Sequence, residues 1–125
     1  MKIKIFIVAF LMSFSSLSMA NSGKDIFNQY CMACHSPSMA SLFNSPAAHN
    51  LEAWNERKEL AFERAIEKNK NIKDLKGIEK ENKSLDELLI SAINGTEKGM
   101  PPKGTCSDCT DEELKSAIKF MNSPE

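Results

Sequence analysis

The five residues Cys31-Met32-Ala33-Cys34-His35 constrain this chain more than any other stretch. Two thiols three positions apart, followed at once by an imidazole, form the C-x-x-C-H signal for covalent attachment of haem. The thiols of Cys31 and Cys34 can add across the two vinyl groups of a haem, and His35 then lies beneath the porphyrin as an axial ligand of the iron. The pattern predicts a haem protein, so the remaining sequence has to supply a second ligand for the iron and the side chains that shield the haem from water.

The amino-terminal twenty residues have the composition of a targeting segment. Lys2 and Lys4 precede an apolar stretch over residues 5–14 that is too short to span a bilayer, and Ser18-Met19-Ala20 has the form of a small-x-small cleavage site. We expect residues 1–20 to be a signal peptide that is cut after Ala20, with an uncleaved membrane anchor as the alternative. The prediction is therefore a periplasmic protein without stable membrane insertion.

The exported part, residues 21–125, has the size of one small domain. The whole chain has a formal net charge of −1, and loss of two lysines with the signal makes the remainder more acidic. Phosphate binding needs a basic surface, so this charge argues against nucleic acid as a partner.

Helix signals account for most of the exported chain. Capping boxes at Ser22-Gly23-Lys24-Asp25, Ser84-Leu85-Asp86-Glu87 and Thr110-Asp111-Glu112-Glu113, together with Asn50 as an N-cap, predict four helix starts. Apolar residues follow each start at helical spacing, and no convincing strand pattern occurs. The expected fold class is all-α, with about four helices around one haem.

The first expected helix carries Gly23, Phe27 and Cys31 at intervals of four residues, which places them on one face. This face is either a generic amphipathic surface or a specific contact, in which Gly23 permits close approach of another helix while Phe27 packs there.

The middle of the chain is densely charged. Residues 56–87 hold nine basic and nine acidic side chains, and the glycine at position 77 suggests a mobile connection between helices. We expect residues 56–84 to form a charged helical insertion with a solvated surface; a docking patch for an acidic redox partner is the alternative.

Met100 is the expected second ligand of the iron. It precedes Pro101 and Pro102, and proline restrains the residue before it to extended geometry, so the thioether of Met100 is carried on a stiff loop. Filling of the core by Met100 is the alternative. Met39 is a competing thioether, and His49 is a possible alternative ligand on the irregular loop of residues 36–49.

Trp54, the only tryptophan, is expected to be buried, and a haem propionate is one candidate acceptor for its indole N–H.

Taken together, these segments resemble class I cytochromes c, and within them the cytochrome c5 group. The resemblance rests on Gly23 to His35, on Trp54-Asn55-Glu56-Arg57, and most specifically on the stretch from Met100-Pro101-Pro102 to Cys109. It implies a small cytochrome c fold with one haem c. It also implies thioether links at Cys31 and Cys34, axial ligands His35 and Met100, and packing of Gly23 and Phe27 near Phe120.

The resemblance further implies a disulfide between Cys106 and Cys109, and haem-edge or propionate contacts of Trp54, Arg57 and Pro101. Cys106 and Cys109 cannot attach a second haem in the usual way, because Thr110 rather than histidine follows them. A disulfide closing so short a loop contributes only about 2 kcal/mol in the chain-entropy model, so it would act as a local clip. A redox-active dithiol is the alternative.

The resulting prediction is a soluble periplasmic monohaem c-type cytochrome, an electron carrier rather than an enzyme. Its partners would be periplasmic or membrane-bound electron donors and acceptors. Two other classes remain: a zinc module built from Cys31, Cys34, Cys106 and Cys109, and a haem enzyme or gas sensor with an open iron site.

Overall fold

The computed structural model describes residues 21–125, so the expected signal peptide lies outside the described residues. All regular elements in this range are helical, and the prediction of an all-α fold is confirmed. In chain order they are α1 (Gly23–Ile26), a π-helical turn η1 (Phe27–Cys31), α2 (Met32–His35), α3 (Leu51–Lys68), a 3₁₀ turn η2 (Lys70–Ile72), α4 (Gly77–Asn94), a 3₁₀ turn η3 (Pro102–Thr105) and α5 (Asp111–Met121).

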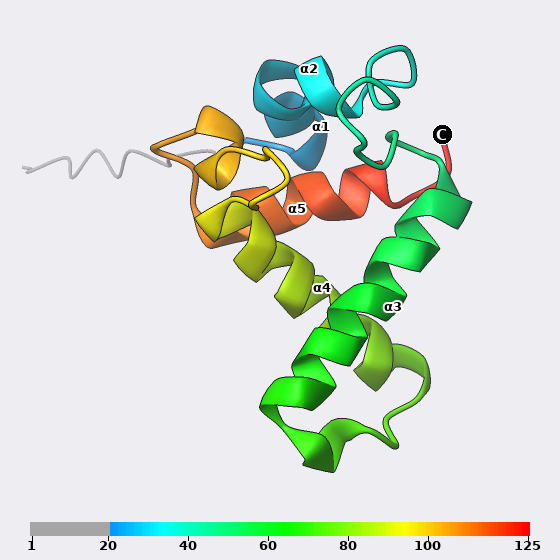
Figure 1. Ribbon diagram of the computed structural model, residues 1–125. Coiled ribbons are helices and arrows are strands. Elements are labelled where there is room, and N and C mark those ends of the chain that lie inside the picture. Colours follow the sequence, from blue (N-terminus) through cyan, green and yellow to red (C-terminus); the bar gives the residue numbers. More distant parts are fainter. Residues whose placement is uncertain (1–20) are drawn as a thin grey trace, which may run out of the picture.

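The first three elements form one continuous helical segment that ends at the haem-attachment motif (Figure 1). Ser22 caps it as predicted: its hydroxyl accepts a hydrogen bond from the backbone N–H of Asp25, and the Asp25 carboxylate accepts one from the backbone N–H of Ser22. A π-helical turn inside a helix often marks a functional site. Here that turn ends at Cys31, the first thiol of the motif, three residues before Cys34.

α1 crosses α5 at Gly23. A Cβ atom on Gly23 would lie 2.2 Å from the carbonyl oxygen of Ser116 on α5, which leaves no room for a side chain. Phe27 packs beside Phe120 with ring centroids 5.3 Å apart. Of the two interpretations of this face, the specific helix contact is therefore confirmed.

α3 begins after Asn50, as expected, and the Asn50 side chain accepts from the backbone N–H of Ala53 at 3.1 Å. The start predicted for the next helix is wrong: α4 begins at Gly77, and Ser84 lies buried inside it with its hydroxyl donating to the Lys80 carbonyl. The connection between α3 and α4 is accordingly confined to residues 69–76.

The early start of α4 has a physical cause in the helix that it faces. α3 and α4 cross and pack against each other, and their far ends project from the other helices (Figure 1); this pair with its connection is named the hairpin below. Three ion pairs join it: Lys58–Glu81 at 3.0 Å, Lys80–Glu59 at 2.7 Å and Lys68–Glu87 at 2.7 Å. Lys80 and Glu81 lie in the additional turns of α4, and the Lys80 ammonium also lies over the Phe62 ring at 5.1 Å, so these contacts with α3 favour the early start.

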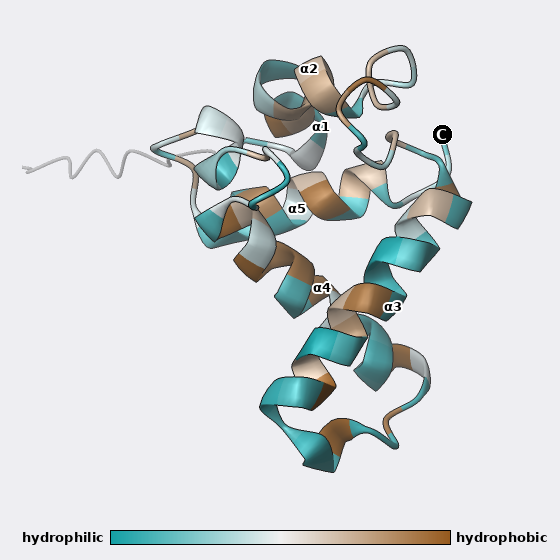
Figure 2. Cartoon of the chain, viewed as in Figure 1, coloured by the Kyte–Doolittle hydropathy of each residue, from teal (hydrophilic) through white to brown (hydrophobic). Residues whose placement is uncertain are grey.

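The core consists of two apolar clusters. The larger joins Phe27, Ala48, Trp54, Leu85, Ala92, Ile118 and Met121. The smaller joins Ile26, Cys106, Cys109, Leu114 and Ala117. Figure 2 shows apolar residues where α4 and α5 meet, whereas hydrophilic residues dominate the free end of the hairpin. Within residues 21–125, no helix combines the length and apolarity needed to cross a bilayer.

Candidate functional site

Cys31 and Cys34 lie at the end of the amino-terminal helical segment as free, half-buried thiols. Burial, assisted by the neighbouring Cys34, raises the pKa of Cys31 to about 11. At neutral pH Cys31 is therefore a protonated thiol beside an apolar cluster, rather than a thiolate. Such a thiol is a weak ligand for a divalent metal, because metal binding by cysteine needs the thiolate.

The ring of His35 is oriented by the loop that follows it. Its Nδ1 lies 2.8 Å from the carbonyl oxygen of Pro46. A carbonyl can only accept, so Nδ1 carries the proton and the lone pair is on Nε2, the form in which an imidazole binds metal. The loop is tied back at two further points: the Ala48 N–H donates to the His35 carbonyl at 2.7 Å, and the Ser45 hydroxyl donates to the Cys34 carbonyl.

His35 is also held neutral. It is only 8% exposed, and burial lowers the pKa of its imidazole; the positive charge of Arg57 acts in the same direction, while the hydrogen bond to Pro46 opposes them. A neutral imidazole is the species that ligates iron. The environment of His35 therefore suits a ligand rather than a surface cation.

Trp54 and Arg57 lie on the first turns of α3, next to this histidine. The Trp54 ring stacks on the His35 ring at a centroid distance of 5.9 Å, and its indole N–H donates to the Ala47 carbonyl at 2.9 Å. The indole N–H is thus already bonded within the protein. Arg57 donates to the carbonyl of Asn44 at 3.1 Å, so both side chains hold the loop of residues 36–49 against α3.

Met100 is half-buried against the larger apolar cluster, which Cys31 also borders. Its loop is closed by two hydrogen bonds with Thr96: the Thr96 N–H donates to the Met100 carbonyl at 2.9 Å, and the Met100 N–H donates to the Thr96 hydroxyl at 3.3 Å. Gly95 is required here, because its φ is +74° and a Cβ would lie 2.7 Å from the Met100 carbonyl oxygen. Pro101 continues the loop in extended conformation and accepts from the Gly104 N–H.

The segment after Met100 is anchored to α5. Cys106 and Cys109 form a disulfide, and both lie buried in the smaller cluster. Lys103 donates from its ammonium to the Cys109 carbonyl at 3.1 Å, although its own backbone is left-handed with φ +54°. The disulfide and this hydrogen bond fix the far end of the Met100 loop.

Met39 and His49, the two alternative ligands considered from the sequence, lie in environments different from that of Met100. Met39 is half-buried in a turn of the loop, where its N–H donates to the Ser36 carbonyl. His49 is turned toward the carboxyl terminus: its Nδ1 bonds the Ser123 carbonyl at 2.7 Å, and its ring packs edge-on against Phe120.

These residues fit a covalently bound haem. Two free thiols, a neutral imidazole with Nε2 available, and a thioether are the donors that c-type attachment and ligation use. Cys31 and Met100 border one apolar cluster, and His35 reaches the same cluster through Trp54. An apolar surround is what a porphyrin needs for burial.

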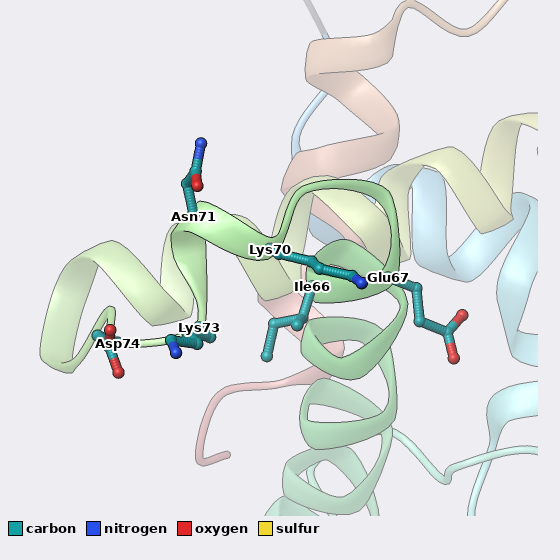
Figure 3. A pocket seen from close by; sticks show the side chains of 6 residues that line it. All are labelled: Ile66, Glu67, Lys70, Asn71, Lys73 and Asp74. Atoms are coloured by element: carbon teal, nitrogen blue, oxygen red, sulfur yellow. The ribbon is translucent and has the colours of Figure 1, made fainter.

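The zinc hypothesis does not fit. Across residues 21–125, which include all four cysteines, no three or more histidine, cysteine, aspartate or glutamate side chains are grouped so as to hold a metal ion. Two of the four sulfurs are also joined to each other in a disulfide. A surface hollow lies at the free end of the hairpin (Figure 3), and it is lined by Ile66, Glu67, Lys70, Asn71, Lys73 and Asp74. This lining of one isoleucine and polar groups of both charges does not offer an alternative cofactor site.

Sequence reasoning missed three supports of the site. These are the Pro46 carbonyl that orients His35, the Ser45 hydroxyl on the Cys34 carbonyl, and Thr96 beneath Met100. A backbone carbonyl has no residue-specific signature, so nothing in the sequence marks Pro46 as an acceptor. Thr96 was detectable in principle, because a hydroxyl between a helix-ending Asn94-Gly95 and a proline loop is a common turn-closing residue.

Comparisons with known proteins found one matching family model and two similar proteins. Residues 18–121 match the family model described as cytochrome c oxidase, cbb3-type, subunit III. The chain is 38% identical to cytochrome c5 of Azotobacter vinelandii over 103 residues, covering 82% of this chain and 94% of that protein. It is 36% identical to cytochrome c5 of Ectopseudomonas mendocina, also over 103 residues, covering 82% of this chain and 90% of the relative.

Proposed function

Because this chain belongs to the class I cytochrome c family and is cytochrome c5-like, we propose that it is a periplasmic electron carrier whose single haem is ligated by His35 and Met100. It is a monohaem c-type cytochrome, an electron-transfer protein and not an enzyme. Its cofactor is covalently bound haem c, which supplies reversible one-electron chemistry at iron. The proposal concerns which residues hold that cofactor and where the protein works.

Cys31 and Cys34 attach the haem in this proposal. Both thiols are unpaired and half-buried, and they lie three residues apart on a helical segment that continues into His35. A helical backbone places residues three apart on the same side, so both sulfurs are presented to one ligand. The same helix fixes His35 relative to the two attachment points.

His35 and Met100 would hold the iron of that haem. The observation that carries the proposal is the hydrogen bond from His35 Nδ1 to Pro46, because it assigns the free lone pair to Nε2. Met100 is supported by its position on a closed loop beside the same apolar cluster as Cys31. Methionine as the sixth ligand favours the ferrous state relative to a second histidine.

With both residues as ligands, the iron would have no site left for a substrate, which suits electron transfer. The chain's task is then to keep the ligand positions unchanged on oxidation and reduction. Thr96, Gly95 and the Cys106–Cys109 disulfide restrain the methionine side. Pro46 and Trp54 restrain the histidine side, so little structural change opposes the transfer.

Replacement of Met100 tests the ligand set. Met100→Ala in the mature haem-loaded protein is expected to lose the long-wavelength sulfur-to-iron absorption band of the oxidised form and to bind carbon monoxide when reduced. Met39→Leu is the matched control, because Met39 is also a half-buried methionine on a loop. It is expected to keep the band and to exclude carbon monoxide.

The opposite pattern, with the band lost in Met39→Leu and kept in Met100→Ala, would reject Met100 as the ligand. Absence of a c-type pyridine haemochrome from the parent protein would reject attachment at Cys31 and Cys34. The two results are independent, because the first reports axial ligation and the second reports thioether attachment.

A further inference from the structure

Met100 lies on a stretch of backbone that has almost no hydrogen-bond donors. Pro101 and Pro102 follow it, and proline has no N–H, so residues 100–102 carry a single backbone N–H. That N–H belongs to Met100, and it donates to the hydroxyl of Thr96 at 3.3 Å. The side chain of Thr96 is therefore the acceptor for the one backbone donor that this stretch offers.

The backbone of Thr96 contacts the same loop. Its N–H donates to the Met100 carbonyl at 2.9 Å, and its carbonyl accepts from the Gly99 N–H at 3.1 Å. Together with the hydroxyl contact, these bonds close a ring from Thr96 to Met100, in the yellow loop that follows α4 in Figure 1. Backbone bonds can form with any residue at position 96, so the hydroxyl contact is the part of the ring that requires a particular side chain.

The ring is attached directly to the end of α4. Gly95 is the C-cap of that helix, and a Cβ on Gly95 would lie 2.7 Å from the Met100 carbonyl oxygen and 2.9 Å from the Pro102 nitrogen. The backbone at position 95 thus lies against the backbone of residues 100–102. Thr96 follows at once, so it connects α4 to Met100, whose side chain packs on the larger apolar cluster.

We propose that the Thr96 hydroxyl is a positioning group for Met100, and that it sets how readily an external ligand displaces the Met100 thioether from the iron. The inference rests on the proposed ligation by Met100. Pro101 restrains the backbone conformation of Met100, but it does not fix Met100 relative to α4. The hydroxyl contact does so, and it thereby reduces the conformational freedom that Met100 has to lose as a ligand.

A positioning effect should be the same in both oxidation states of the iron. The contact lies between the Met100 backbone and Thr96, so its loss weakens thioether ligation by one factor in the ferric and the ferrous protein. The midpoint potential compares these two states and is expected to stay unchanged. A substitution that altered the donor strength of the thioether would instead shift the potential, because methionine ligation favours ferrous iron.

Binding of imidazole to the oxidised, mature, haem-loaded protein tests the inference. Thr96→Val keeps the shape of the side chain and removes the acceptor. We expect it to bind imidazole about fivefold more tightly than the parent, since one hydrogen bond of this kind contributes roughly that factor. Loss of the sulfur-to-iron band during the titration gives the affinity, and a redox titration without imidazole gives the midpoint potential.

Three further variants complete the experiment. Thr96→Ala removes the same hydroxyl and is expected to repeat the gain in affinity, whereas Thr96→Ser keeps the hydroxyl and should stay within about twofold of the parent. Thr105→Val is the matched control, because it makes the same replacement at an exposed position beyond Met100. There the threonine carbonyl accepts from the Ser107 N–H, so imidazole affinity is expected to be parental.

Equal imidazole affinities of the parent and Thr96→Val would overturn the inference. So would a Thr96→Ser variant that binds as tightly as Thr96→Val, or an equal gain in Thr105→Val, which would indicate general loosening of the loop. A midpoint shift of about 40 mV in Thr96→Val, which corresponds to about fivefold for one electron, would overturn the positioning role as well. A parent without the sulfur-to-iron band would reject Met100 ligation itself, whereas equal affinities in a parent that has the band would reject Thr96 alone.

Discussion

Gly23 shows how a single missing side chain sets the geometry of the haem-binding end. The backbone of α1 lies so close to α5 that an added carbon would meet the carbonyl oxygen of Ser116 at 2.2 Å. The same crossing brings Phe27 onto Phe120 and places the helical segment that ends in Cys31 and His35. A displacement of α1 would therefore move the attachment residues.

Gly23→Ala is expected to lower the free energy of unfolding by about 2 kcal/mol or more, because the added carbon overpacks a backbone contact that cannot yield. Gly77→Ala is the control. Gly77 has a left-handed φ of +57° but no atom near its missing Cβ, so only backbone strain of about 1 kcal/mol is expected there. Urea unfolding of the mature holoprotein gives both values, and equal losses at the two glycines would contradict the crossing.

At the scale of elements, local capping and cross-helix contacts act differently. Ser22 and Thr110 cap α1 and α5 with the reciprocal hydrogen bonds that the sequence predicts. Ser84 has the same kind of motif yet lies inside α4, because packing against α3 and the ion pairs Lys58–Glu81 and Lys80–Glu59 extend the helix toward Gly77. A capping box thus predicts the start of a helix reliably only where no partner helix stabilises the turn before it.

The α5 cap is expected to make stability sensitive to acid. Hydrogen bonds from the backbone N–H of Thr110, and then of Asn21, lower the pKa of Glu113 below its usual range. A carboxyl group with a lowered folded-state pKa stabilises the fold fully above the ordinary glutamate pKa of about 4.3, and this contribution is lost as pH falls through the folded-state value. Glu113→Gln should therefore lose less stability than the parent on acidification.

Urea midpoints measured from neutral pH to about pH 3 would check this expectation. Glu112→Gln is the matched control, since it removes the same charge from the same helical turn without removing the capping-box side chain. The assignment fails if the two variants show the same pH dependence.

At the scale of the whole molecule, charge and apolar surface are separated. The hairpin carries the cross-helix ion pairs, while the segment from Phe27 to Asn50 carries the haem motif and no formal charge. Two of these ion pairs are partly buried, since the Lys58 side chain is 15% exposed and the Glu87 side chain is 10% exposed, and together the pairs specify how α3 and α4 align. The proposed electron-carrier role needs the mature protein to be free in the periplasm.

The exported protein is expected to begin at Asn21 and to carry one haem c, and the intact mass of protein isolated from the periplasm checks both. Cleavage after Ala20 would convert the Asn21 nitrogen, which lies 3.0 Å from a Glu113 carboxylate oxygen, into an ammonium group. The new terminus would thus meet an opposite charge at the start of α5. A mass equal to the full chain plus haem, recovered with membranes, would instead support the uncleaved anchor.

The sequence by itself determined the parts of this protein whose chemistry is local. Cys31, Cys34 and His35 can be proposed as attachment residues because attachment requires those residue types at that spacing, and Met100 can be proposed as a ligand because two prolines stiffen the backbone beside it. The caps at Ser22, Asn50 and Thr110 follow from hydrogen bonds within four residues. Their assignment needed no knowledge of the fold.

Only the tertiary structure decided what depends on distant backbone. The carbonyl that orients His35 comes from Pro46, eleven residues away, and any residue type could have supplied it. The start of α4 depends on α3, and the need for glycine at position 23 depends on Ser116. Backbone acceptors and helix contacts have no residue-specific pattern, because they arise where two segments meet and not within either one.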